Sequence, residues 1–358
     1  MSWKEKTKKT LHRYFIEGLS GMALGLFCSL IVGLIIKQIA LLFGDHPFGI
    51  MLNAFGNLAS VLMGPIVGIA IAHTLQGPKL VLYASGVTGL IGAFADKVTS
   101  GAIFVDGGVF LKGPGDPLGA FIAVIVGVEV GRLIAGKTKL DIIMTPIVTI
   151  LAGSAAGILA GPPVSRGMQW LGEMIDLATQ LQPFLMGIVL STVMGVLLTL
   201  PISSAAISLM LGLSGLAAGA ATVGCATQMV GFAVASYIDN GMNGLLAQGL
   251  GTSMLQISNI MKKPTIWIPA TLASAILGPL STLVFHMENN AAGAGMGTAG
   301  LVGPLMTWQT MSETNPVGLL LFKIIAMYFV LPGALTWIIT KFMRTQGWIQ
   351  KGDMKLEL

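Results

Sequence analysis

The chain has 358 residues, of which 54% are hydrophobic and 10% charged, and its mean hydropathy is +0.83. Soluble domains carry about 25% charged residues, so this composition excludes a soluble globular protein. The net charge of +5 predicts no nucleic-acid partner, because lysines and arginines of a membrane protein mark loops that stay in the cytoplasm. The 48 glycines allow helices to approach one another closely in lipid. We therefore expect an all-α, polytopic integral membrane protein.

Ten apolar runs follow a basic segment, residues 1–17, which we expect to lie amphipathically on the inner leaflet. An even number of spans places both termini on one side, together with the basic loops at Lys79, Lys139 and Lys263. The positive-inside rule assigns that side, with the tail 342–358, to the cytoplasm of a bacterial plasma membrane. The predicted spans are 18–43, 51–75, 80–95, 118–135, 140–161, 184–200, 202–222, 244–261, 265–285 and 317–341.

Similar strings recur at a slowly drifting offset. SVLMG (60–64) resembles STVMG (191–195), and GVTGLIGAFA (86–95) resembles GLSGLAAGAA (212–221). Because a basic loop occupies the same place in both units, the predicted duplication is parallel rather than inverted. The predicted organisation is one membrane domain, 1–358, with repeat units 51–161 and 184–286 and a further segment 287–341.

Three segments between spans, 96–117, 223–243 and 286–316, are too polar for ordinary spans, and we expect them to re-enter the membrane. Irregular backbone at that depth is tolerated only where protein or water satisfies it. Amides and hydroxyls there suit hydrogen bonds to a small polar solute, and an imidazole with carboxylates can pass a proton. The competing interpretation is that these are external loops with solvated charges. The predicted solute-binding residues are His286, Glu288, Asn289, Asn290, Gln309, Glu313, Asn315, Asp96, Asp106, Asp116, Thr227, Gln228 and Asn243.

Motifs of soluble enzymes are missing from the sequence. It has no P-loop, no zinc-protease helix motif, no Cys-x-x-Cys pair and no nucleophile elbow, so we predict no catalytic residue, no metal and no cofactor. The two cysteines, Cys28 and Cys225, are far apart in apolar context and are expected to be free thiols. Glu129 and Arg132, three residues apart on one predicted helix, are expected to form a structural ion pair.

The Gly-Pro-punctuated spans, the Gly-Leu-x-x-Gly-type repeats and NPVG at 315–318 resemble the membrane permease component, enzyme IIC, of the bacterial phosphotransferase system. The resemblance is nearest to the divergent branch that includes the perfringolysin regulator PfoR. It implies a homodimer that works with separate phosphocarrier proteins. Sugar-transporting members share a Glu-Pro dipeptide that holds the sugar, whereas this chain has Asn315 before Pro316 and the carboxylate at Glu313. The resemblance implies that His286 corresponds to the family's sugar-site histidine.

Two hypotheses about function follow. The first is a permease for a sugar-like solute that works by alternating access, with membrane lipid around it and no phosphoryl-carrying domain in the chain. The second is a membrane sensor that binds a solute and regulates gene expression through a protein partner. A lipid-modifying enzyme is a third interpretation, but the sequence offers no catalytic constellation for it.

Overall fold

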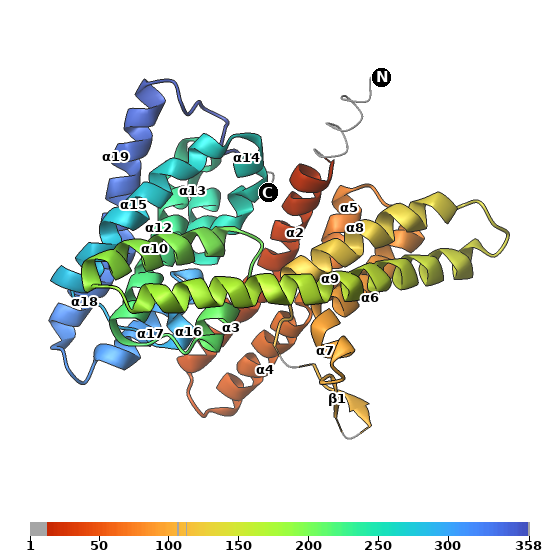
Figure 1. Cartoon of the computed structure of the whole chain (residues 1–358), viewed down its shortest axis with the longest axis horizontal. Coiled ribbons are helices and arrows are strands. Elements are labelled where there is room, and N and C mark those ends of the chain that lie inside the picture. Colours follow the sequence, from red (N-terminus) through yellow and green to blue (C-terminus); the bar gives the residue numbers. More distant parts are fainter. Residues whose placement is uncertain (1–12, 106, 112, 357–358) are drawn as a thin grey trace. The chain divides into compact units, whose positions relative to one another are not determined.

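The structure, a computed structural model, describes residues 13–105, 107–111 and 113–356 (Figure 1). Its contacts divide the chain into two compact units, Met1–Gly167 and Met168–Leu358. Each of the two predicted repeat units falls within one of them. The described residues are predominantly helical, and the only sheet among them is one small hairpin. The all-α class is therefore confirmed, while the duplication stays a prediction.

Unit 1 consists of apolar helices that pack through glycines. A Cβ at Gly68 would overlap the carbonyl of Ser85, and one at Gly89 would overlap that of Gly64. The neighbouring helices α5 and α6 therefore touch backbone to backbone, as small residues permit in lipid. The elements are η1 Arg13–Gly18, α2 Leu19–Leu26, η2 Phe27–Ile31, α3 Val32–Leu41, α4 Pro47–Val61, α5 Met63–Thr74, α6 Lys79–Ala93, α7 Ala95–Thr99, β1 Phe104–Val105, β2 Gly108–Val109, α8 Pro117–Ile134 and the first part of α9 Asp141–Thr179.

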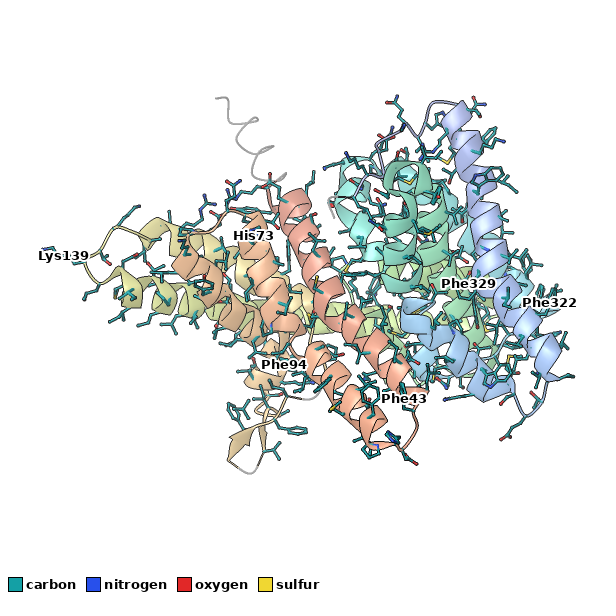
Figure 2. The ribbon with its side chains drawn as sticks, turned by 180° about the vertical axis from the view of Figure 1, so that it is seen from behind. Phe43, His73, Phe94, Lys139, Phe322 and Phe329 are labelled. Atoms are coloured by element: carbon teal, nitrogen blue, oxygen red, sulfur yellow. The ribbon has the colours of Figure 1, made fainter. Side chains whose placement is uncertain are left out.

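An ion cluster joins three helices of unit 1. The carboxylate of Glu129 lies 3.8 Å from Arg132 Nη1, which confirms the predicted pair, and 3.1 Å from Arg13 Nε. Both arginines also donate to the carbonyl of Leu75 at the end of α5, at 2.8 and 3.3 Å. Because every member has a partner, the cluster is structural. In Figure 2, Lys139 lies far from it, at the tip of the loop between α8 and α9.

Unit 2 is organised around α12, whose sequence is dominated by Gly, Ala and Thr. A Cβ at Gly224 would overlap the Ser191 carbonyl of α10, and one at Gly219 would overlap that of Met287. Helices α10, α15 and α19 all pack on α12, which is buried along nearly its whole length. The remaining elements are α10 Pro183–Thr199, α11 Ser204–Met210, α12 Gly215–Ala235, α13 Tyr237–Leu246, η3 Ala247–Gly251, η4 Ser253–Gln256, α14 Ile257–Lys262, η5 Pro264–Trp267, α15 Ile268–Pro279, η6 Leu280–Val284, α16 Ala291–Ala294, η7 Ala299–Leu301, α17 Val302–Met311, α18 Val317–Ile325, η8 Ala326–Val330 and α19 Leu331–Thr345.

Within the described residues, six helices are long and apolar enough to cross a membrane, or up to seven if the pair α4 and α5, bent by 49°, forms one span. Large apolar side chains on their outer faces, such as Phe322 of α18, are exposed, as expected of lipid-facing residues (Figure 2). The chain is therefore a multi-pass membrane protein, and the predicted number of ten spans is not confirmed. The six helices are Arg13–Leu41, Pro117–Ile134, Asp141–Gly161, Gly215–Ala235, Pro264–Val284 and Val317–Thr345.

Three predictions about unit 2 are wrong. The expected span 202–222 is divided between the short helix α11 and the start of α12. Most of the expected re-entrant segment 223–243 is the second half of α12, because its polar residues are satisfied inside the protein instead of breaking the helix. The expected span 244–261 is interrupted at Thr252, where the backbone is extended.

The first re-entrant candidate, 96–117, contains a short helix and the exposed hairpin.

Candidate solute site

An interrupted helical segment, α13–η3–η4–α14, brings unusual backbone into unit 2. It starts with a kink at Gly241, whose φ of 59° and ψ of −152° fit glycine alone. It breaks again at Thr252, with φ −160° and ψ 141°, and the Thr252 hydroxyl caps the next turn by accepting from Met254 N–H. Such interruptions in a membrane protein occur where protein or a water-filled cavity satisfies the backbone.

Four amide side chains line this interrupted segment and define the amide cluster: Asn240, Gln248, Gln256 and Asn259. Gln248 and Gln256 are fully buried, and Asn259 is nearly so. Gln256 Nε2 donates to Gln248 Oε1 at 2.9 Å, and Asn259 Nδ2 donates to Gln256 Oε1 at 2.8 Å. Gln248 Nε2 donates in turn to Ser236 Oγ at 2.8 Å. Gln248, Gln256 and Asn259 therefore form a connected chain of neutral donors and acceptors, the chemistry that recognises hydroxyl groups.

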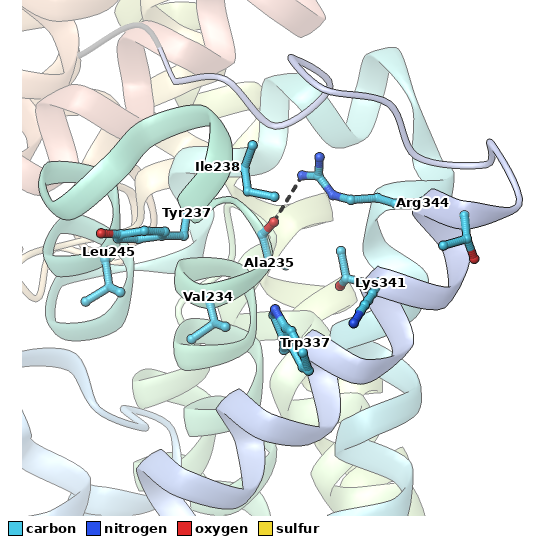
Figure 3. Close-up of a pocket in the computed structure, with 10 residues that line it drawn as sticks. Val234, Ala235, Tyr237, Ile238, Leu245, Trp337, Lys341 and Arg344 are labelled. Carbon is cyan, nitrogen blue, oxygen red and sulfur yellow. Dashed lines mark hydrogen bonds between the residues drawn. The ribbon is translucent and has the colours of Figure 1, made fainter.

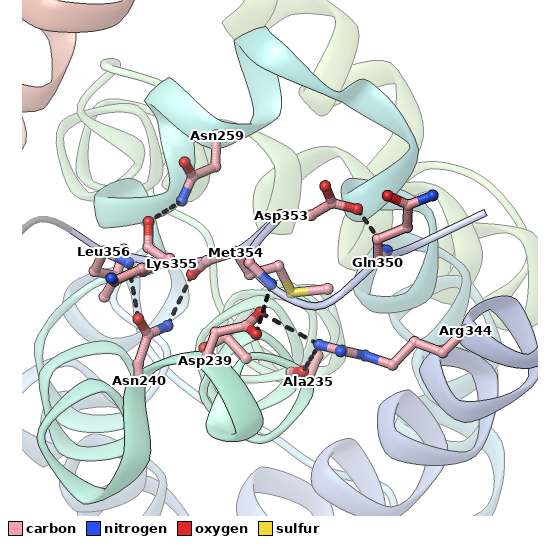
Figure 4. Close-up of polar contacts among 12 residues, drawn as sticks. Ala235, Asp239, Asn240, Asn259, Arg344, Gln350, Asp353, Met354, Lys355 and Leu356 are labelled. Atoms are coloured by element: carbon pink, nitrogen blue, oxygen red, sulfur yellow. Dashed lines mark hydrogen bonds and ion pairs between the residues drawn. The ribbon is translucent and has the colours of Figure 1, made fainter. Parts of the chain in front are cut away.

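The C-terminal segment, Gln350–Leu356, passes beside Asn240 and Asn259 of the amide cluster (Figure 4). The carbonyl of Met354 accepts from Gln256 Nε2 at 3.0 Å and from Asn240 Nδ2 at 2.8 Å. The carbonyl of Lys355 accepts from Asn259 Nδ2 at 2.9 Å. Leu356 N–H donates to Asn240 Oδ1 at 2.8 Å. Backbone groups of this segment therefore satisfy hydrogen-bonding groups of three of the four amides.

Two carboxylates that take part in ion pairs also fix the same segment: Asp239 accepts a hydrogen bond from it, and Asp353 belongs to it. Arg344 Nη2 lies 3.4 Å from Asp239 Oδ2, and the other oxygen of Asp239 accepts from Gly352 N–H at 2.8 Å. Lys263 Nζ lies 2.6 Å from Asp353 Oδ2. Partial burial opposes ionisation of Asp353, but hydrogen bonds from Lys263 and from Gln350 N–H outweigh it and hold the pKa of the carboxyl below its ordinary value.

A second buried network lies around Gln228 of α12. Its Oε1 accepts from Trp267 Nε1 at 3.0 Å, and its Nε2 donates to Thr271 Oγ1 at 3.2 Å. Thr199 Oγ1 lies 3.4 Å from Gln228 Oε1 and 2.8 Å from Ser253 Oγ of η4. Because Ser253 and Gln256 belong to the same short turn, this network adjoins the amide cluster. Gln228 is the predicted residue that comes nearest to it by hydrogen bonds.

The predicted residues in 286–318 divide into buried structural amides and exposed side chains. Asn289 Nδ2 donates to Thr222 Oγ1 at 2.8 Å and to the Gly303 carbonyl at 3.2 Å, and Asn290 caps α16. Asn315 is half-buried and accepts from Lys323 Nζ at 3.0 Å. The segment therefore anchors α16 and α17 to α12 and does not converge as a whole. The exposed members are His286, Glu288, Gln309 and Glu313.

The other predicted residues are equally dispersed. Asp96 and Asn243 are exposed, and Asp106 lies outside the described residues. Asp116 caps α8, accepting from Leu118 N–H at 3.2 Å and Gly119 N–H at 3.0 Å. Thr227 is buried and donates to the Val223 carbonyl within its own helix. These four described residues have local roles or face solvent, and none contacts the amide cluster.

Gln248, Gln256 and Asn259 are absent from the predicted binding residues because they lie in the run 244–261, whose apolarity predicts one continuous span. A signal was nevertheless present, because Gln248, Gln256 and Asn259 are three amides within one expected span, where polar side chains are rare and usually have a specific role. No cluster of three or more His, Cys, Asp or Glu side chains that could hold a metal ion occurs in the part of the chain that the structure describes.

The fold and this buried network of amides define a helical membrane protein with a polar interior. Comparison with known families is more specific: the family model "Phosphotransferase system, EIIC" matches residues 16–356. The chain therefore belongs to the EIIC family of the phosphotransferase system, as the resemblance of its Gly-Pro-punctuated spans indicated, and it is a membrane component of sugar transport. A search of curated proteins found no match.

Proposed function

We propose that this protein carries a small, hydroxylated, sugar-like solute across the membrane by alternating access, and that the amide cluster binds the solute. The observation that carries this proposal is the interrupted segment of unit 2, whose three buried amides form one connected chain. Interrupted helices at membrane depth supply solute sites in transporters, and neutral amides match hydroxyl groups as both donors and acceptors. Membership of the EIIC family supports a sugar-like solute.

The C-terminal segment takes the place of the solute in this proposal. Three amides donate to the carbonyls of Met354 and Lys355, and solute hydroxyl oxygens would accept the same hydrogen bonds. Entry of the solute then requires this segment to move away. The exposed predicted residues, such as Glu313 and His286, stay proposed contacts at an earlier stage of the transport path.

The family also supports separate phosphocarrier proteins as partners, and we propose that the protein works with them as a homodimer. Uptake by liposomes that contain the purified protein alone tests the first of these. If sugar enters at full rate without phosphocarrier proteins, the proposal of phosphoryl coupling is wrong. Cross-linking of the protein in native membranes tests the proposed homodimer. If the protein is a monomer there, this proposal is wrong.

Opposite effects of two variants test the site. Purified protein is screened by thermal unfolding against hexoses, amino sugars, polyols and their phosphates, and each stabilising compound is tested for uptake. Gln256→Met removes the central amide at similar volume, and we expect affinity for the solute to fall about two- to tenfold, as for one lost neutral hydrogen bond. Asp353→Asn leaves the amides intact but weakens the C-terminal segment, so we expect affinity to rise.

Gln346→Met, at an exposed position of the chain, is the matched control and should leave affinity unchanged. If Gln256→Met folds with unaltered affinity, the amide cluster does not bind the solute. If Asp353→Asn lowers affinity, the C-terminal segment belongs to the binding site and does not compete for it. Binding without any uptake would favour a sensor over a transporter.

A further inference from the structure

A cavity at the end of the last helix carries features that the transport proposal does not use. It has a volume of about 600 Å³ and lies between the end of α12, α13 and the last turns of α19 (Figure 3). One wall is apolar, with Val234, Ile238 and Leu245, and the α19 side presents Trp337, Lys341 and Arg344. The candidate span Val317–Thr345 ends here, which places the cavity at the depth of a bilayer interface.

The cations of this cavity are incompletely compensated. Lys341 Nζ lies 4.9 Å from the centre of the Trp337 ring, and it forms no ion pair with a carboxylate of the described residues. Arg344 donates through Nη2 to the Ala235 carbonyl at 3.1 Å and to Asp239 at 3.4 Å. Two cations and one adjacent carboxylate leave a net charge of about +1, which one phosphodiester would neutralise.

Two buried polar atoms at the cavity have no hydrogen-bond partner. They are the hydroxyl oxygen of Thr340, a residue only 3% exposed, and Nε of Arg344. Burying a donor without a partner costs about 1–3 kcal/mol, so natural proteins rarely leave two together. Both residues line the cavity, and both atoms carry a hydrogen that an anionic oxygen would accept.

We propose that this cavity binds the headgroup of an anionic phospholipid. The phosphate lies against Lys341, Arg344 and the Thr340 hydroxyl, and the acyl chains run along the apolar wall with Ile238 and Leu245. Tyr237 and Trp337, both about half exposed, occupy the level that aromatic residues prefer at an interface. Basic pockets between membrane helices recognise anionic headgroups by this combination of charge and apolar surface.

Binding to purified full-length protein in neutral detergent tests the proposal. Short-chain phosphatidylglycerol, short-chain phosphatidylcholine and inorganic phosphate are titrated separately, and the rise of the unfolding temperature gives each apparent Kd. We expect phosphatidylglycerol to stabilise and the other two to have little effect. Lys341→Gln should lower the affinity for phosphatidylglycerol about fivefold. The matched variant Lys139→Gln, in the α8–α9 loop, should leave this affinity unchanged.

Thr340→Val separates a ligand role from a structural one. Since the Thr340 hydroxyl has no partner, the variant should be at least as stable as the natural protein without lipid, while phosphatidylglycerol binds about tenfold more weakly. Equal stabilisation by phosphatidylcholine, or by inorganic phosphate, would overturn the proposal. Equal losses of phosphatidylglycerol affinity in Lys341→Gln and Lys139→Gln would also overturn it, because the loss would then reflect the net charge of the protein and not this cavity.

Discussion

At the scale of single residues, Asn289 shows how a polar side chain in this protein is used for structure. Its amide donates to Thr222 on α12 and to the carbonyl of Gly303, and its oxygen accepts from Asn290 N–H at 2.8 Å. Only 1% of the residue is exposed, and its partners Thr222 and Gly303 are buried as well. By contrast, the side chain of Asn243 is exposed to solvent.

Asn289→Ala should therefore destabilise the protein by about 2–3 kcal/mol, because it leaves buried groups of α12 and of the 286–318 segment unpaired. Thermal or denaturant unfolding in detergent measures the change. The control Asn243→Ala is expected to stay within about 0.5 kcal/mol of the natural protein. Equal stability of the two variants would mean that water satisfies the groups around Asn289.

The Lys263–Asp353 pair makes stability depend on pH. Because the folded protein holds the pKa of Asp353 below the ordinary carboxyl value of 3.8, the unfolded chain binds the proton more readily. The contribution is thus fully present above that value and is lost as the pH falls through the lower folded pKa. Unfolding of the natural protein and of Asp353→Asn, measured between about pH 7 and 3, should show a stability gap that narrows below about pH 4. A difference in stability that widens as the pH falls would contradict a stabilising role of the Lys263–Asp353 pair.

At the scale of elements, the kink of α13 depends on one glycine. Gly241 has a conformation that other residues adopt only with strain, and no atom lies within 4 Å of the position where a Cβ would be. Gly241→Ala thus isolates the backbone cost, which we expect to be about 1–3 kcal/mol of lost stability. Gly318→Ala, in the first turn of α18 with equally open space, should be neutral or slightly stabilising. Similar losses in both variants would mean that the α13 kink is not required.

Sequence patterns predict these elements unevenly. Long apolar runs predicted five of the six candidate spans to within five residues at each end, because burial in lipid requires length and apolarity. They failed at α12, where glycine and alanine lower the hydropathy and buried Thr227 and Gln228 look like the lining of a path. They failed again at Thr252, because its side-chain cap begins a new turn within a run whose apolarity predicts one continuous span. The carbonyls of Met354 and Lys355 carry no side-chain identity at all, so no residue pattern reveals their role.

At the scale of the whole molecule, the orientation in the membrane remains a prediction of the basic loops. Cysteines introduced at Lys139 and at Lys351 should both react with a membrane-impermeant maleimide only from the cytoplasmic side. The background variant needs Cys28, which is exposed, replaced, whereas Cys225 is buried. Labelling of one site from each side would show an odd number of spans between them and would reject the ten-span arrangement.

The bonds between the amide cluster and the C-terminal segment also impose an order in time. Gln256, Asn259 and Asn240 precede their carbonyl partners by 98, 96 and 114 residues. At about 5–20 residues per second, the ribosome adds the partners roughly 5–20 s after the amides. During that interval the amides must keep water or another protein as partner, because lipid offers none. The interrupted segment is therefore expected to enter its final position late, after α15 and α19 have been inserted around it.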